Sequence, residues 1–155
     1  MKETVRKLDH IEHILLRPDT YVGSTSKVTE EAWVVGAEGT SLDRQVLTYS
    51  PALLKIFDEL LVNTIDRNAL YPKDVNTIAV SVDDSTGAIT VENNGPLGGL
   101  AVEIHDTHGI YNPELIFGHL MTSTNYDDSV KRIVGGRNGY GAKLCNVYSR
   151  QFSIK

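Results

Sequence analysis

The chain has 155 residues, of which 41% are apolar and 23% are charged. This length matches about one ordinary domain, and the composition excludes a disordered or collagen-like chain. The net charge is −5, which disfavours DNA binding by this chain because that binding neutralises phosphates with Lys and Arg. No apolar run approaches the roughly 20 residues of a membrane span, so we expect no membrane partner.

The first elements along the chain are predicted to be a short helix and a hairpin. Apolar residues at helical spacing predict a helix over residues 8–16. Pro18 ends it, because proline disfavours helical geometry in the residue before it. Two strands, 33–35 and 45–49, are then predicted around a turn at 39–41.

A long helix is predicted from Pro51 to about Leu70, because Ser50 before Pro51 is a typical helix start. Apolar side chains cover this helix except for one stripe, an arc of about 80° that holds Lys55, Glu59, Asn63 and Asp66. On such a face a carboxylate can orient a water and an amide can offer an oxygen to Mg²⁺. The alternative interpretation is an ordinary solvated helix face.

A second hairpin is predicted from strands 77–82 and 88–92 around the turn 83–87. The second strand leads directly into Asn93, Asn94 and Gly95, a polar corner. An amide at such a place can pair with the donor and acceptor edge of a base, although asparagine before glycine is also typical of a simple turn.

A helix is predicted from Pro113 to about Met121, and a further helix starts near Leu144. The glycine-rich run 135–143 opens that last helix. Its backbone N–H groups can converge on an anion, aided by the helix dipole and by the charges of Arg137 and Lys143. The run lacks the Walker pattern, and the alternative is a flexible loop. Residues 151–154 predict a strand without neighbours, hence a C-terminally truncated sheet.

Other candidate sites are weaker. The pairs His10 with His13 and His105 with His108 have metal-ligand spacing but no evident third ligand. The single cysteine, Cys145, excludes an internal disulfide, fits a reducing compartment and favours packing over nucleophilic chemistry.

Taken together and in order, these segments resemble the N-terminal ATPase region of eukaryotic-type (type IIA) DNA topoisomerase II, a member of the GHKL superfamily. The likeness covers nearly the whole chain, through residues 12–24, 55–63, 93–95, 115–118, 122–128 and 135–146. The resemblance implies a GHKL (Bergerat) ATPase fold: an α/β two-layer sandwich with helices on one face of a mixed β-sheet, in one domain over residues 1–155.

The resemblance also implies roles for individual residues. Glu59 matches the general base that orients water against the γ-phosphate, Asn63 the Mg²⁺ ligand, and Asn93 the adenine-reading position. The remaining ATP contacts match Ser123, Thr124, Asn125, Arg137, Asn138, Gly139, Tyr140, Gly141, Ala142 and Lys143. Three places depart from the family pattern: the loop from Pro96 to Ala101, Arg67 where a second asparagine is frequent, and Val5 where relatives have a tyrosine that reaches the partner subunit.

By the same resemblance, the complete protein is expected to pass one DNA duplex through another, using ATP to close a homodimer gate. The transducer lysine, the metal-binding acidic domain and the tyrosine that cleaves DNA are absent from these 155 residues, so the isolated fragment is expected to bind ATP better than it hydrolyses it. The alternatives are a non-catalytic, nucleotide-dependent dimerisation module and a kinase of the same superfamily. The expected location is the nucleus for a cellular protein, and a viral factory or virion for one from a large DNA virus.

Overall fold

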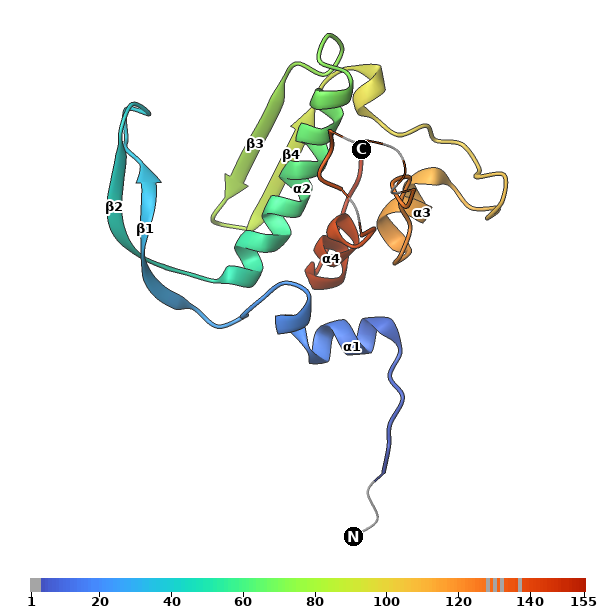
Figure 1. Cartoon of the computed structure of the whole chain (residues 1–155), viewed down its shortest axis with the longest axis horizontal. Coiled ribbons are helices and arrows are strands. Elements are labelled where there is room, and N and C mark those ends of the chain that lie inside the picture. Colours follow the sequence, from blue (N-terminus) through green and yellow to red (C-terminus); the bar gives the residue numbers. More distant parts are fainter. Residues whose placement is uncertain (1–3, 128, 130, 132, 137) are drawn as a thin grey trace. The chain divides into compact units, whose positions relative to one another are not determined.

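A computed structural model describes residues 4–155 except 128, 130, 132 and 137. The chain divides into two compact units, Met1–Lys55 and Ile56–Lys155, and the helix α2 (Pro51–Leu70) crosses the boundary between them. Figure 1 shows the order of the elements along the chain. Of the helices described, none combines the length and the apolar character that would let it cross a membrane.

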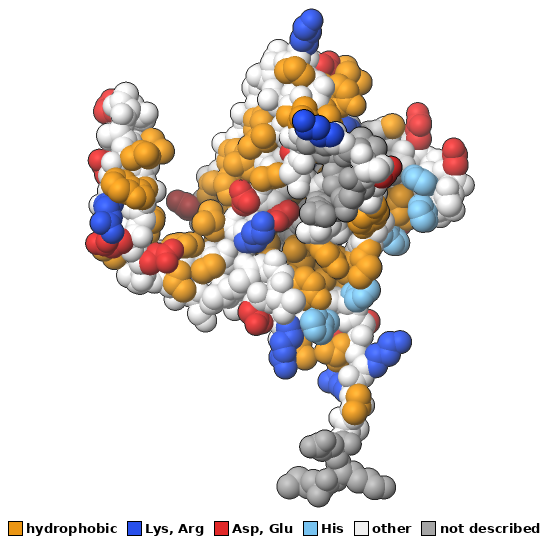
Figure 2. Space-filling view, in the orientation of Figure 1, with side chains coloured by type: hydrophobic (Ala, Val, Ile, Leu, Met, Phe, Trp, Pro, Cys, Tyr) orange, Lys and Arg blue, Asp and Glu red, His pale blue; other side chains and the backbone are white. Residues whose placement is uncertain are grey.

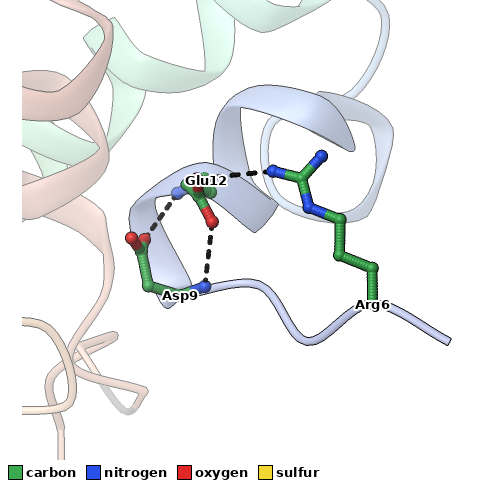
Figure 3. A network of polar contacts seen from close by, with 3 residues as sticks. All are labelled: Arg6, Asp9 and Glu12. Atoms are coloured by element: carbon green, nitrogen blue, oxygen red, sulfur yellow. Dashed lines mark hydrogen bonds and ion pairs between the residues drawn. The ribbon is translucent and has the colours of Figure 1, made fainter.

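The first unit begins with α1 (His10–Leu16), which has a capping box. The Glu12 backbone N–H donates to Asp9 Oδ1 at 2.8 Å, and the Asp9 N–H donates back to Glu12 Oε2 at 3.3 Å. Arg6 lies 3.6 Å from the other oxygen of Glu12 (Figure 3). The predicted helix is therefore confirmed, and a 3₁₀ turn at Pro18–Thr20 follows it.

The first hairpin consists of β1 (Val28–Val35) and β2 (Leu42–Tyr49), paired antiparallel. Both strands start earlier than the predicted ranges 33–35 and 45–49. Their first residues are mostly polar, and they pair across the hairpin although they do not show the alternation of apolar residues that predicts a strand. Directly opposed residues share a face, and Trp33 opposite Arg44 places a guanidinium 5.9 Å from the indole ring. Apolar side chains are exposed on this hairpin (Figure 2).

The helix α2 runs over the predicted range. The Leu53 N–H donates to Ser50 Oγ at 3.4 Å, so Ser50 caps the helix as its residue type favours. The second unit continues with the hairpin of β3 (Ile78–Asp83) and β4 (Ala88–Asn93). Asp83 accepts hydrogen bonds from the Ser85 and Thr86 hydroxyls in the turn, and these bonds lower the pKa of its carboxyl to about 2.

The C-terminal part holds a 3₁₀ turn at Pro96–Gly98 and the helices α3 (Asn112–Gly118) and α4 (Gly141–Tyr148), which pack against each other. The Asn146 side chain donates to the Phe117 carbonyl at 3.1 Å, and the Phe117 and Phe152 rings lie 5.8 Å apart. The buried side chains of this unit are Val75, Leu115, Ala142, Lys143, Leu144 and Cys145.

Three predictions need correction. The strands described form two separate antiparallel pairs in place of one mixed sheet, because each pair is closed by a short turn and no crossover joins them. Residues 151–154 are not a strand, since no described segment pairs with them. The helix α3 ends at Gly118, before Met121, which has a left-handed φ of 60° that a continuing helix excludes.

Candidate functional site

The predicted base, Glu59, lies directly against the glycine-rich segment. A Cβ atom built on Gly141 would overlap Glu59 Oε2 and would lie 3.0 Å from the Glu59 carboxyl carbon. Gly141 is the first residue of α4, so the half-buried carboxylate is at the positive end of that helix. Only glycine allows the backbone to approach the carboxylate this closely.

The last polar residue of the stripe, Asp66, also reaches this segment. Its Oδ1 accepts from the Gly135 N–H and its Oδ2 from the Gly136 N–H, each at 2.9 Å. The glycine pair therefore already holds an anion, the carboxylate of Asp66. Asn63, between Glu59 and Asp66 on the same stripe, has an exposed side chain.

Lys143 is buried in the first turn of α4. Its Nζ donates to the Thr122 carbonyl at 2.7 Å, and burial lowers the pKa of its ammonium to about 8. The hydrogen bond of Lys143 holds Thr122 to α4. When the lysine is protonated, its charge is poorly solvated. Thr122 belongs to the segment 122–128 that carries the family resemblance, but no role was predicted for it beside the expected contacts Ser123, Thr124 and Asn125.

The backbone before α4 turns at Gly139, which has a left-handed φ of 68°. A Cβ atom at Gly139 would lie 2.7 Å from both the Thr122 carbonyl oxygen and the Tyr126 hydroxyl oxygen. Tyr140 follows as the N-cap residue, and no side chain among the described residues caps α4. The start of α4 is therefore the positive end of a helix that no described side chain caps, and it lies beside the Glu59 carboxylate.

The other predicted ATP contacts lie on the same two segments. The Asn125 amide donates to the Gly136 carbonyl at 2.8 Å, and its backbone N–H donates to Ser123 Oγ at 3.1 Å. Thr124 and Asn138 are exposed, whereas Ala142 is buried in α4. Arg137 lies outside the described residues.

Cys145 is buried one turn further along α4. Its thiol lies 2.8 Å from the Ile56 carbonyl, and burial followed by the charge of Glu59 raises its pKa to about 12. The thiol therefore stays protonated at neutral pH and packs, as the sequence indicated.

The predicted adenine reader, Asn93, ends β4 and lies in a different polar group. Its half-buried amide lies against Gly98, where a Cβ atom would overlap Asn93 Nδ2. The corner is built by Asp74, whose carboxylate accepts from the Leu97 N–H at 2.7 Å and whose carbonyl closely approaches Gly95, at a φ of 82°. Asp74 carried no motif signal in the sequence.

Two of the three departures from the family pattern meet in the structure. The Arg67 guanidinium donates to the Gly99 carbonyl at 2.9 Å, so an arginine of α2 holds the altered loop after β4. Val5, the third departure, has an exposed side chain.

Within the described residues, no three His, Cys, Asp or Glu side chains gather as a metal site. His13 Nδ1 is 2.8 Å from the Tyr21 hydroxyl, and the His105 and His108 rings are 4.9 Å apart. A site with one amide ligand, Asn63, is compatible with Mg²⁺, which takes most of its ligands from water and phosphate oxygens.

Comparison with known proteins identifies the family. Residues 48–154 match the model of the histidine kinase-, DNA gyrase B-, and HSP90-like ATPase. DNA topoisomerase 2 of Penicillium chrysogenum is 48% identical over 155 residues, which are 100% of this chain and 10% of that protein. DNA topoisomerase 2 of Arabidopsis thaliana is 49% identical, with the same coverage. The chain thus spans about a tenth of these relatives.

The solved ATPase region of Saccharomyces cerevisiae topoisomerase II superposes with a TM-score of 0.87 at 46% identity, over 94% of this chain and 38% of that one. The ATPase and transducer domains of Balamuthia mandrillaris DNA topoisomerase II give the same TM-score at 50% identity, over 94% and 36%. These matches confirm the α/β GHKL fold. The chain belongs to the histidine kinase-, DNA gyrase B- and HSP90-like ATPase family, and within it is similar to the ATPase region of eukaryotic DNA topoisomerase II.

Proposed function

We propose that this chain binds ATP with Mg²⁺ and that, in the complete protein, it drives closure of a homodimer gate in a type IIA DNA topoisomerase. The observation that carries the proposal is the contact of Glu59 with Gly141. This contact joins a half-buried carboxylate of α2 to the backbone that opens α4. A carboxylate and a set of backbone N–H groups are the two components that phosphate hydrolysis requires of the protein.

In this proposal Glu59 accepts a proton from the water whose oxygen attacks the γ-phosphorus. The bond from the γ-phosphorus to the bridging oxygen breaks, and ADP leaves with that electron pair. The backbone of Gly139, Gly141 and Ala142, with Lys143, receives the phosphates. Positive charge at the start of α4 stabilises the negative charge of the transferred group.

Asn63 would hold Mg²⁺ through its amide oxygen, next to Glu59 on the same face of α2. When bound, Mg²⁺ neutralises negative charge on the phosphate oxygens. Asn93 would read the adenine edge with its donor and acceptor atoms, while Ser123, Thr124 and Asn125 would contact the ribose and phosphates. Arg137 belongs to the same proposal as a further positive charge.

The test is the substitution Glu59→Gln in the full-length protein. The glutamine keeps the size and polarity of the side chain but cannot take up the proton. We expect affinity for a non-hydrolysable ATP analogue to change less than about threefold and turnover to fall by roughly 10²–10⁴. Glu103→Gln, at an exposed position away from the site, is the matched control. Equal turnover of Glu59→Gln and the unaltered protein would refute the role of Glu59 as base.

A non-catalytic dimerisation module is the second candidate. Two observations favour it: Lys143 already bonds to the Thr122 carbonyl, and Gly135 and Gly136 already bond to Asp66. The candidate predicts that an ATP analogue with Mg²⁺ causes dimerisation, measured by light scattering, without any hydrolysis in the full-length protein. Hydrolysis that Glu59→Gln abolishes would exclude it.

A further inference from the structure

The carboxylate of Asp66 accepts hydrogen bonds from two consecutive N–H groups of the glycine-rich segment, and this pair of bonds is the grip of Asp66. Each oxygen accepts one hydrogen bond of 2.9 Å, from Gly135 and from Gly136. The Gly136 carbonyl also accepts from the Asn125 amide at 2.8 Å. Gly136 is therefore held at both its N–H and its carbonyl, and Gly135 at its N–H.

Consecutive backbone N–H groups that point to one place form an anion site, and bonds to a charged acceptor are stronger than bonds between neutral groups. Here the anion belongs to the protein itself. The N–H groups of Gly135 and Gly136 are consequently engaged before any phosphate arrives. This leaves the later part of the segment, from Gly139 into α4, for a nucleotide.

The geometry of α2 links the contact of Asp66 with the glycine-rich segment to the position of Glu59. Asp66 and Glu59 are seven residues apart, which is about 10 Å along the helix axis and about 20° around it, so both side chains leave the same face. The glycine-rich segment touches Asp66 at Gly136 and Glu59 at Gly141. Five Cα–Cα steps separate these two points, and their full extension is about 17 Å. A chain this short that is held at one end has few positions for the other.

We infer that Asp66 is a positioning residue. It fixes the Gly135–Gly136 end of the glycine-rich segment to α2, so that the backbone at Gly139 and Gly141 is set against the Glu59 carboxylate before nucleotide binds. Such preorganisation raises affinity because less conformational entropy is lost on binding. The inference rests on the proposed function for its effect on nucleotide, although the grip itself does not.

Three variants of the full-length protein test the grip. Asp66→Ala removes both acceptors, Asp66→Asn keeps one, and Asp84→Asn removes an equivalent charge from an exposed turn. Hydrogen exchange is followed by mass spectrometry, without nucleotide, on peptides that contain Gly135 and Gly136. We expect exchange to accelerate about tenfold in Asp66→Ala, less in Asp66→Asn, and not at all in Asp84→Asn. Unchanged exchange in both Asp66 variants would overturn the inference.

The second measurement is affinity for an ATP analogue with Mg²⁺, beside turnover and the thermal unfolding midpoint. We expect Asp66→Ala to weaken binding about tenfold while the unfolding midpoint stays within a few degrees of that of Asp84→Asn, and Asp66→Asn to lie between. Faster exchange with unchanged affinity would overturn the positioning role. If the unaltered protein binds no nucleotide at all, the proposed function fails, while the exchange data still decide whether the grip exists.

Discussion

A single added methyl group, in Gly141→Ala, tests whether the contact between α2 and α4 sets the position of Glu59, the carboxylate that we propose as the base. The new Cβ atom would overlap Glu59 Oε2 and would lie 3.0 Å from the carboxyl carbon and 3.3 Å from the Glu59 Cβ. Carbon atoms prefer separations of about 3.5–4.0 Å. The carboxylate must therefore move by about 1 Å or turn into another rotamer.

The expected magnitudes differ sharply between stability and rate. Alanine in place of glycine favours a helix by up to about 1 kcal/mol, and an off-rotamer glutamate costs about 0.5–1.5 kcal/mol. These effects oppose each other, so the free energy of unfolding should change by less than about 1 kcal/mol. A displacement of about 1 Å at a reacting group, in contrast, lowers the rate by about 10²-fold.

ATP turnover, analogue affinity and urea unfolding of the full-length protein measure these quantities. Gly118→Ala is the matched control, because a Cβ atom at Gly118, the last residue of α3, meets nothing within 4 Å. We expect the control to keep its turnover. If Gly141→Ala folds normally and also keeps turnover within about twofold, the contact with Gly141 does not align Glu59, and the base assignment loses its structural support.

Two further predictions concern stability. The pKa of Lys143 is about 8 in the folded chain and 10.5 as an ordinary value, so between these pH values the unfolded chain binds more protons and the free energy of unfolding should rise with pH. Urea unfolding from pH 7.5 to 10.5 should show this rise, and Lys143→Met should remove it; parallel curves for both proteins would contradict the assignment. Ile14→Ala should lower the free energy of unfolding by about 2–5 kcal/mol because Ile14 is 1% exposed, whereas Ile11→Ala, at a side chain 52% exposed on the same helix, should cost less than about 1 kcal/mol. Equal losses at Ile11 and Ile14 would contradict the burial of Ile14.

The elements with local signals could be predicted from the sequence. Ser50 and Pro51 mark the start of α2 because capping involves atoms within one turn. The turn after β3 follows from Asp83, whose carboxylate satisfies the next two hydroxyls. In contrast, residues 151–154 alternate as a strand does, yet a strand exists only where a neighbour pairs with it, and alternation contains no information about that neighbour.

The candidate site divides in the same way. The stripe on α2 was predictable, since residues three and four apart share a helix face. The corner around Asn93 was recognisable only in part, because Asp74 reaches the Leu97 N–H across 23 residues without any motif.

The glycine-rich segment shows why composition identifies an anion site but not its anion. Adjacent glycines predict N–H groups that are free to converge, and every carboxylate or phosphate is an equally suitable partner on that basis. The choice depends on which charge the fold brings within hydrogen-bond reach, and here that charge is Asp66, 69 residues earlier in the chain. In the proposed function, the glycine-rich segment binds two anions: Asp66 holds the part near Gly135, and the part that opens α4 receives the nucleotide. Releasing Asp66 would therefore return N–H groups to solvent rather than add contacts to a bound phosphate, so we expect weaker nucleotide binding, not tighter, when this carboxylate is lost.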